Sequence, residues 1–599
     1  MSFTILGIHV FRGMRNDIKK RLPYYVADWT VDAWNYRIIP ATVKSLPRST
    51  WPRKYGLMRF WAAHSVLPAI AFALDIRADR SPGKRFSKTE NSYGVNEVLL
   101  ASVLGALLFS VFAGQPLCIV GVTGPISVFN YTVYEIITPR GTPFFAFMCW
   151  ICLWSMVMHF AIAITNGVNG LRYITRFSCD IFGFYVAFIY LQKGIQVLTR
   201  QFDRSDIEAF ISIMVALLVL IFGYTCHAIG HQSGLFWRPV RRFLADYGTP
   251  LVVIFFTGFV HIGKLREYGI QTLPTSAAFR PTASGTPARP HGWFIHFWHD
   301  IAVGDVFLAI PFAVLLTVLF YFDHNVSSLI CQGKEFPLKK PGAFHWDFFL
   351  LGVSTGIAGI LGIPAPNGLI PQAPFHTISL CVVRHDKLDD DGSTEKKQLI
   401  ENVIEQRVSN FAHGLLILGT MSGPLLVVLG LVPQAVLAGL FWIMGLTALQ
   451  GNGIVLKIYY LCKDRALTLP TDPLRRVRLG SIYVFVAIEL VAFGATFAIT
   501  QTIAAVGFPA ILLLFAAFAT VLPRIFGADE LRVLDEPTAS EVTMASVMAD
   551  LPGAGGVSSS VEMVDVDGFA NALELREWGR TSGSLDEGSS RRRRVSRPY

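Results

Sequence analysis

Charged residues are scarce in this sequence. Only 16% of its 599 residues are Asp, Glu, Lys or Arg, whereas a soluble domain carries about 25%. The mean hydropathy of +0.47 also excludes an ordinary soluble globular domain. Long apolar runs alternate with short charged connectors, a pattern typical of helices that cross a hydrocarbon layer about 30 Å thick. We therefore predict an all-α polytopic membrane protein.

Motifs of enzyme chemistry are also missing. The chain has no nucleophile elbow, no phosphate-binding loop and no cluster of metal ligands, so we expect no enzyme activity, no metal and no other cofactor. Cys149 and Cys152 have redox-motif spacing, but they lie in an apolar run without a second pair, which favours buried cysteines over redox or zinc chemistry. The net charge of +10 does not indicate nucleic-acid binding, because most basic residues lie in connectors between apolar runs.

An N-terminal apolar leader is lacking as well. The first 54 residues hold ten Lys or Arg, so we expect no cleavable signal peptide, and we expect the first span itself to direct insertion into the membrane.

Twelve apolar runs are predicted spans, at residues 60–74, 98–113, 143–164, 181–198, 207–224, 250–262, 303–322, 348–363, 411–431, 435–449, 482–498 and 504–522. Two further apolar stretches, 121–137 and 368–383, are interrupted by Gly and Pro and bring the expected number to fourteen.

Basic connectors predict the orientation. With both termini in the cytosol, most basic segments fall on the cytosolic side, as the positive-inside rule expects. They are the N-terminal segment and the connectors at 238–242, 334–340, 384–397 and 457–478. The basic connector at 77–88 is the exception, because it falls on the external side. We expect the plasma membrane, with the vacuolar membrane as the alternative. The predicted regions are a basic segment 1–55, a seven-span repeat 56–262, a flexible external loop 263–299, a second seven-span repeat 300–523 and a disordered cytosolic tail 524–599.

The two interrupted stretches share one pattern. Each has a short extended piece followed by a proline, Pro125 in the first and Pro374 in the second, and proline favours the first helical position. We therefore predict two half-helices, from Pro125 to about Ile137 and from Pro374 to Val383. Interrupted segments at matching places in two halves indicate a transporter binding site, and two helix N-termini offer unpaired N–H groups and partial positive charge to an anion. The alternative is a pair of proline-kinked structural helices.

Several motifs resemble the bicarbonate/borate anion-transporter family. They are Phe11-Arg-Gly-Met-Arg-Asn-Asp17, Gly114-Gln-Pro-Leu117 through Gly121-Val-Thr-Gly-Pro125, Phe322-Asp-His-Asn325, Lys334-Glu-Phe-Pro-Leu-Lys-Lys-Pro341, Asn367-Gly-Leu-Ile-Pro-Gln-Ala-Pro374 with His376, and Glu405-Gln-Arg-Val-Ser-Asn410. The resemblance covers roughly residues 10 to 525, and the string around Pro374 is similar to the boron-exporter branch of plants and fungi. Where chloride/bicarbonate members carry an arginine, four residues before the histidine, this chain has Gln372.

The resemblance implies a fold and a function. It implies fourteen spans in 7+7 inverted repeats, with spans 1–4 and 8–11 as a mobile core and the remaining spans as a gate, in a homodimer. The expected function is efflux of borate, a small inorganic anion, across the lipid bilayer, with exchange of bicarbonate or another small anion as the alternative. Nucleobase and sulfate transporters share the general architecture, and a membrane scaffold with a recruiting tail is a different class that remains open.

The candidate substrate-binding residues come from both half-helices and the eighth span. They are Thr123, Gly124, Pro125, Asp323, Gln372, Ala373, Pro374, Phe375 and His376. The resemblance places a transport-critical acid at Asp323, and an acid inside a span is expensive and a functional candidate by default. An interfacial acid near Lys334 is the alternative for Asp323, and a packed core histidine is the alternative for His376.

Overall fold

The computed structural model describes most of the membrane region. The described residues are 4–5, 8–30, 92–231, 235–276, 278–282, 289, 292–370, 372–385, 398–464, 468, 472–536, 538–540 and 543. Within them, seven helices are long and apolar enough to cross a membrane, or nine if each of two bent helix pairs forms one span. The fold is therefore helical and of the multi-pass membrane type.

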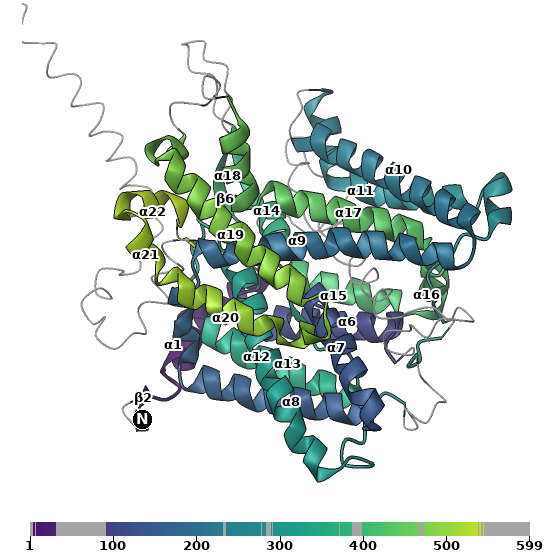
Figure 1. Cartoon of the computed structure of the whole chain (residues 1–599), viewed down its shortest axis with the longest axis horizontal. Helices are drawn as coiled ribbons and strands as arrows, with labels where there is room; N and C mark the ends of the chain where they lie inside the picture. The colour runs from purple at the N-terminus through teal and green to yellow at the C-terminus, as the bar shows by residue number, and fades with distance from the viewer. Residues whose placement is uncertain are drawn as a thin grey trace, which may run out of the picture. The chain divides into compact units, whose positions relative to one another are not determined.

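The secondary structure is helical apart from short strand pairs (Figure 1). The elements of the first part are β1 (Thr4–Ile5), β2 (Ile8–His9), α1 (Arg12–Arg21), α2 (Tyr25–Trp29), α6 (Val95–Phe112), β3 (Val120–Gly121), α7 (Gly124–Ile137), α8 (Phe144–Ile164), α9 (Arg176–Thr199), α10 (Asp206–His231) and α11 (Arg238–Val260). Those of the second part are α12 (Val303–Cys331), α13 (Phe344–Leu361), β4 (Asn367–Gly368), α14 (Gln372–Ser379), β5 (Cys381–His385), β6 (Gln398–Val403), α15 (Val408–Thr420), α16 (Gly423–Leu429), α17 (Gln434–Gln450), α18 (Gly453–Cys462), α19 (Leu479–Ile499), α20 (Phe508–Ala519), α21 (Leu522–Ile525) and α22 (Ala528–Leu534).

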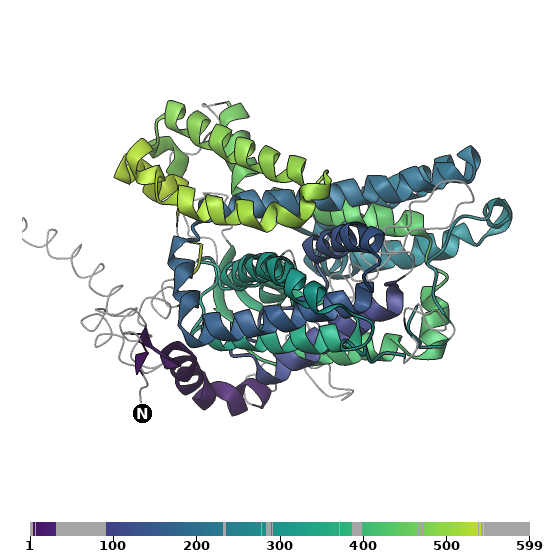
Figure 2. The ribbon, with the colours of Figure 1, turned by 60° about the horizontal axis from the view of Figure 1, so that its bottom comes forward.

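Long helices pack in pairs from distant parts of the chain. Helix α8 lies beside α12 and α13, and α9 lies beside α17 (Figure 2). Glycines permit the closest approaches: a Cβ at Gly359 of α13 would lie 2.5 Å from the Cβ of Cys152 on α8. Cys149 and Cys152 are free and buried in this contact, which places both cysteines inside the helix packing.

The expected spans coincide with helices, apart from the first. The span at 60–74 lies outside the described residues, and the others fall on α6, α8 to α13, α15 to α17, α19 and α20. The span at 411–431 is two helices, α15 and α16, that meet at 87°. The second of them begins at Gly423-Pro424, and proline favours the start of a helix over its interior.

The two half-helices are present, and the extended pieces before them pair with each other. Strands β3 and β4 run antiparallel with Val120 opposite Gly368 and Gly121 opposite Asn367. Helix α7 begins at Gly124, directly before Pro125, and ends at Ile137 as expected. The pairing of β3 with β4 brings the starts of the two half-helices into one region of the molecule.

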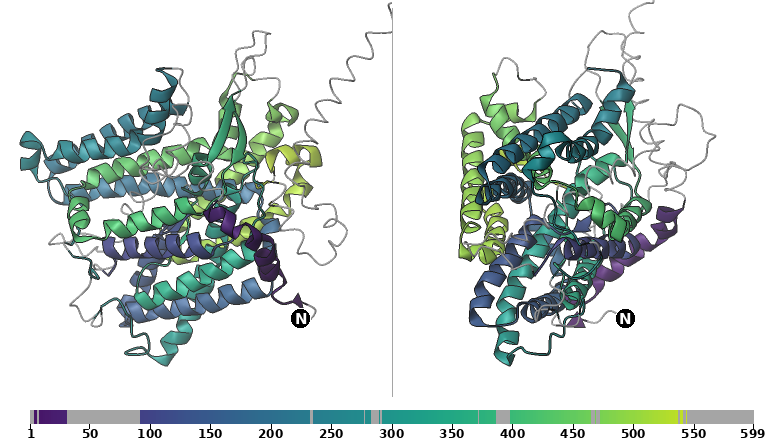
Figure 3. Two further views of the ribbon diagram at one scale, coloured as in Figure 1. Left: turned by 180° about the vertical axis from the view of Figure 1, so that it is seen from behind. Right: turned by 90° about the vertical axis from the view of Figure 1, so that its right-hand side faces the viewer.

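Three expectations need correction. The second half-helix runs over Gln372–Ser379 instead of reaching Val383, because Cys381–His385 forms a strand paired with β6 (Figure 3) and β-branched residues favour strands. The region after residue 524 is not wholly disordered, since α22 is helical and Arg478 pairs with its Glu530 at 2.7 Å. The described part of the loop 263–299 is anchored, since Thr282 donates its backbone N–H to Glu97 at 2.6 Å.

A cluster of buried charges attaches the N-terminal segment to the rest of the molecule. Asp28, fully buried on α2, accepts from Arg407 at 3.1 Å and from Lys340 at 2.5 Å, and lies 3.4 Å from Arg21. Arg21 also lies 3.6 Å from Glu405. Buried charges are tolerated when they pair with each other, so the cluster fixes α1 and α2 against the start of α15.

Candidate functional site

Asp323 is a buried acid in the middle of the candidate site. It lies on α12, its residue exposure is 1%, and its Oδ2 accepts two hydrogen bonds. The donors are Thr123 Oγ1 and Asn367 Nδ2, each at 3.0 Å. Because Thr123 precedes α7 and Asn367 lies on β4, one carboxylate oxygen connects both interrupted segments to α12.

Close approach of the chain to α12 makes this geometry possible. A Cβ at Gly368 would lie 2.9 Å from the Cα of His324, a distance that a larger residue cannot adopt without displacing the backbone. The preceding Asn367 accepts the backbone N–H of Gly368 with its own Oδ1 at 2.8 Å, so its amide nitrogen is turned toward Asp323. Glycine at position 368 therefore places the amide of Asn367 within reach of the acid.

The extended backbone before α7 is covered by side chains. Asn410 donates to the carbonyl oxygens of Pro116 and Cys118 at 3.3 Å, and the Nδ1 of His376 lies 2.9 Å from the carbonyl oxygen of Leu117. Non-helical backbone at membrane depth is stable only where protein or a wet cavity satisfies it. Side chains of Asn410 and His376 therefore satisfy the backbone carbonyl groups of the extended segment before α7.

No side chain among the described residues caps the N-terminus of α7. Thr123 occupies the capping position in an extended conformation, with φ −104° and ψ 162°, but its hydroxyl group donates to Asp323 instead of accepting from the first turn. Pro125 has no N–H to offer, and the first-turn N–H groups keep the partial positive charge of a helix start. This end of α7 suits a negatively charged or hydrogen-bond-accepting ligand.

Helix α9 closes the other side of the site. The amide of Gln372 is 1% exposed. It makes no hydrogen bond of good geometry with the described residues, but it lies within interaction range of the Tyr190 hydroxyl. Tyr190 and Tyr185 of α9 both lie within electrostatic range of Asp323. Tyr190 is therefore the residue of α9 that lies near both the acid and the start of the second half-helix.

The structure brings some predicted site residues together more directly than others. Thr123 and Asp323 are in hydrogen-bond contact, and Gly124 and Pro125 begin α7 beside them. In α14, Gln372 faces Tyr190, Ala373 is buried, and Pro374 and Phe375 are half-buried. The ring of His376 is engaged on both sides, with Nε2 2.7 Å from Ser409 Oγ, so its contact with a ligand stays a prediction.

Two contributors were missing from the sequence prediction. Asn367 lies inside the quoted Asn-Gly motif, and its amide contact with Asp323 could have been sought among polar residues just before the half-helix. Tyr190 gave no signal of this kind, since tyrosine is common in an apolar span. A different signal on the same helix was overlooked: Lys193 is a basic residue within the predicted span 181–198.

Comparisons with known proteins identify a family and several similar transporters. The family described as the HCO3- transporter integral membrane domain matches residues 9–210 and 205–539. Similar proteins include a candidate transporter of Schizosaccharomyces pombe, 53% identical over 87% of this chain and 95% of that protein. Boron transporter 1 of Saccharomyces cerevisiae is 46% identical over 92% of this chain and 88% of that protein.

More distant similarities extend beyond the fungi. The human Band 3 anion transport protein is 26% identical over 88% of this chain and 56% of its own length. Among solved structures, the transmembrane domain of the cyanobacterial bicarbonate transporter BicA matches 77% of this chain and 98% of that chain with a TM-score of 0.46 and 12% identity. Since the family match covers most of the sequence, the chain belongs to the bicarbonate-transporter family of integral membrane proteins.

Proposed function

We propose that this protein is a secondary active anion transporter that exports borate. The observation that carries the proposal is the Asp323 site, where one carboxylate oxygen joins both interrupted segments. The 46% identity to a yeast boron transporter over most of the chain supports borate as the cargo. Exchange of bicarbonate is the second candidate, and the match to the HCO3- transporter family favours it.

The charge of the cargo follows from its chemistry. Boric acid is largely neutral near pH 7 and crosses lipid unaided, so an exporter has to bind the minority anion. The starts of α7 and α14 each contribute about 0.3–2 kcal/mol toward a bound anion. With a few side-chain hydrogen bonds, this corresponds to roughly millimolar affinity, about −4 kcal/mol, which is weak enough for release. The amide of Gln372 offers a hydroxylated solute both a donor and an acceptor.

Asp323 has a role in coupling in this proposal. An ionised carboxylate beside an anion site repels the anion, so Asp323 takes up a proton as borate binds and releases it when borate leaves. The two hydrogen bonds from Thr123 and Asn367 stabilise the ionised form between cycles. His376 positions the backbone of the first interrupted segment, and Ala373, Pro374 and Phe375 shape the pocket wall.

The transport cycle is proposed to follow the 7+7 architecture. A core of spans 1–4 and 8–11, which includes α7, α12 and α14, slides against a gate of spans 5–7 and 12–14, which includes α9. The site then opens to one side of the membrane at a time, between the half-helices and Tyr190. We propose a homodimer in the plasma membrane with both termini in the cytosol.

A boron-sensitive yeast strain lacking its own exporter tests the proposal. Cells that express this chain at the surface should hold less intracellular boron than cells with empty vector, after loading in the same medium. Intracellular boron that matches the vector control, with surface expression confirmed, would refute borate export. Chloride-dependent recovery of intracellular pH would then point to bicarbonate exchange, against which the neutral Gln372 argues.

A further inference from the structure

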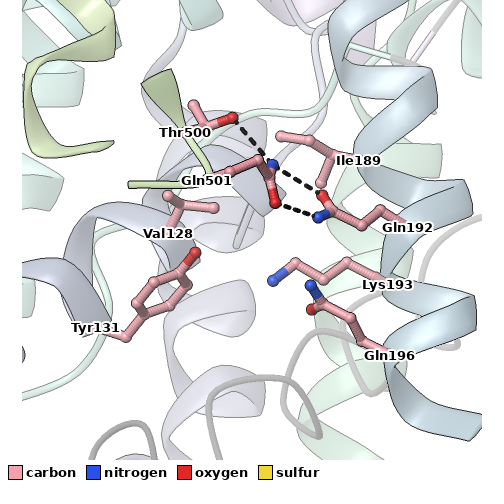
Figure 4. A pocket seen from close by; sticks show the side chains of 8 residues that line it. All are labelled: Val128, Tyr131, Ile189, Gln192, Lys193, Gln196, Thr500 and Gln501. Carbon is pink, nitrogen blue, oxygen red and sulfur yellow. Dashed lines mark hydrogen bonds between the residues drawn. The ribbon is translucent and has the colours of Figure 1, made fainter. Parts of the chain in front are cut away.

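A polar hollow lies between α7, α9 and the turn after α19 (Figure 4). It holds about 250 Å³ of empty space, part of which is open to solvent. The described residues that line it are Val128, Tyr131, Ile189, Gln192, Lys193, Gln196, Thr500 and Gln501. None of these residues is acidic, and most are polar, which is unusual for a surface within spanning helices.

Lys193 supplies a positive charge to this hollow. The residue is 3% exposed, and its Nζ lies 5.3 Å from the centre of the Tyr131 ring on α7. Figure 4 shows the ammonium group pointing into the hollow toward Tyr131, with the amide of Gln196 beside it. A basic residue buried in a spanning helix is expensive and marks an ion or substrate pathway by default.

Gln196 supplies an acceptor. Its Oε1 is buried and makes no hydrogen bond within the described part of the chain, whereas the amides of Gln192 and Gln501 bond to each other, with Gln501 Nε2 donating at 3.3 Å. A buried acceptor without a donor is unfavourable. A hydroxyl group on a bound solute would satisfy it, beside the charge that Lys193 provides for an anion.

The hollow lies further along α9 than Tyr190, the residue of this helix near the Asp323 site. Lys193 follows Tyr190 by three residues and therefore lies on the same helix face, about 4.5 Å further along. The start of α9 is near the basic connector at 334–340, since Arg176 and Lys334 both contact Glu536. Because that connector is predicted to be cytosolic, Lys193, about 25 Å from Arg176 along the helix, lies toward the external face.

We propose that this hollow is an external binding site for a small hydroxylated oxyanion, which it holds on the way between the Asp323 site and the outside. Lys193 attracts the charge, and Gln196 accepts a hydrogen bond from a hydroxyl group of the anion. The inference rests on the proposed function, because it assigns the same cargo to a second position. It predicts that substituting Lys193 or Gln196 changes the KM for borate at the external face and not at the cytosolic face.

Sealed vesicles of the two orientations test the site. Borate influx into right-side-out vesicles samples the external face, and influx into inside-out vesicles samples the cytosolic face, both at one fixed pH. For Lys193→Gln and Gln196→Leu we expect the external KM to rise about tenfold with the external kcat changed less than about twofold. The cytosolic KM should not change, while the cytosolic kcat falls about tenfold, because detailed balance fixes the ratio of kcat/KM in the two directions. Lys193→Arg should retain the wild-type external KM, and Lys264→Gln, at an exposed residue outside the hollow, is the matched control.

Each result has a distinct meaning. Unchanged external KM values in Lys193→Gln and Gln196→Leu, with active wild-type protein, would overturn the external site and leave borate export intact. An equal fall of kcat at both faces with both KM values unchanged would also overturn it, because Lys193 would then only hold α9 against α7. If Lys193→Gln gives no folded protein, Gln196→Leu decides alone. Wild-type vesicles that move no borate would refute the proposed function itself.

Discussion

Two buried charged regions of this molecule are organised in opposite ways. In the cluster around Asp28, acids and bases neutralise one another: Asp28 faces Arg21, Lys340 and Arg407. At Asp323, the hydrogen bonds come from two neutral groups, the hydroxyl of Thr123 and the amide of Asn367. Removing one partner of a buried ion pair leaves an uncompensated charge, so the first arrangement is suited to holding segments together. The second leaves a carboxylate that can change its protonation state.

Neutralising Asp323 should have the largest effect on transport. Asp323→Asn resembles the protonated acid, so we expect borate still to bind. The variant cannot form the ionised carboxylate that the hydrogen bonds from Thr123 and Asn367 stabilise. Because hydrogen bonds to a charged group contribute up to about 3 kcal/mol, we expect efflux to fall about 100-fold. Boron efflux from loaded cells measures the rate, and borate-dependent thermal stabilisation of purified protein measures binding. Asp305→Asn, on the same helix and in contact with Thr142, is the control and should transport normally. Wild-type efflux in Asp323→Asn would remove the assigned role.

Neutralising Asp28 should have the largest effect on stability. Asp28→Asn leaves Arg21, Lys340 and Arg407 without their shared carboxylate, and a broken buried pair costs about 3–5 kcal/mol. We expect a clearly lower Tm in detergent, with transport per folded molecule nearly unchanged. Glu536→Gln is the matched control, because its pair with Lys334 is about half exposed and such pairs contribute less than about 1 kcal/mol. A variant of wild-type Tm would show that the cluster does not hold the N-terminal segment.

Removing one neutral donor from Asp323 should have an intermediate effect on transport. Thr123→Val leaves the carboxylate with Asn367 alone, and a hydrogen bond to a charged group is worth about 1.5–3 kcal/mol. We expect efflux to fall about tenfold and its pH dependence to move, while Thr123→Ser retains both. Thr132→Val, on the helix that follows Thr123, is the control, because the hydroxyl group of Thr132 donates to the backbone carbonyl oxygen of Val128. Equal efflux in Thr123→Val and Thr132→Val would argue against a role for this donor.

The contrast between the two regions also explains what could be predicted from the sequence. Apolar runs and their prolines predicted the spans and both half-helices, because hydrocarbon thickness and the missing proline N–H act locally. The pairing of Val120 with Gly368 joins two-residue strands from opposite halves of the chain, and no local signal specifies it. Asp323 could be identified by its intrinsic cost in a span, whereas Tyr190 became visible only through its position near Gln372.

The C-terminal helix α22 was missed for a related reason. Its surroundings are rich in acidic and small residues, a composition typical of disorder, yet tertiary contacts hold it. Asp535 accepts the backbone N–H of Phe177 at 2.8 Å, and Ser540 donates its backbone N–H to the backbone carbonyl oxygen of Gln332 at 3.0 Å. Contacts of this kind between residues hundreds of positions apart are not encoded in local composition.

The smallest effect is expected at an exposed pair, which contrasts with both buried regions. Arg478 holds Glu530 of α22 by hydrogen bonds and lowers the pKa of that carboxyl group from 4.5 to about 2. A carboxyl group whose pKa is lowered in the folded state stabilises it above the unfolded pKa and loses this contribution as the pH falls toward the folded value. Glu530→Gln should therefore increase hydrogen exchange in α22 at pH 7, and its difference from wild type should shrink as the pH is lowered from about 5 to 3. Asp529→Asn, a neighbouring acid of the same first helical turn, is the control. Because exposed pairs contribute little to the stability of the fold, Glu530→Gln should leave the protein folded and its transport rate unchanged. An equal response of both variants would show that general charge, and not the Arg478 contact, holds α22.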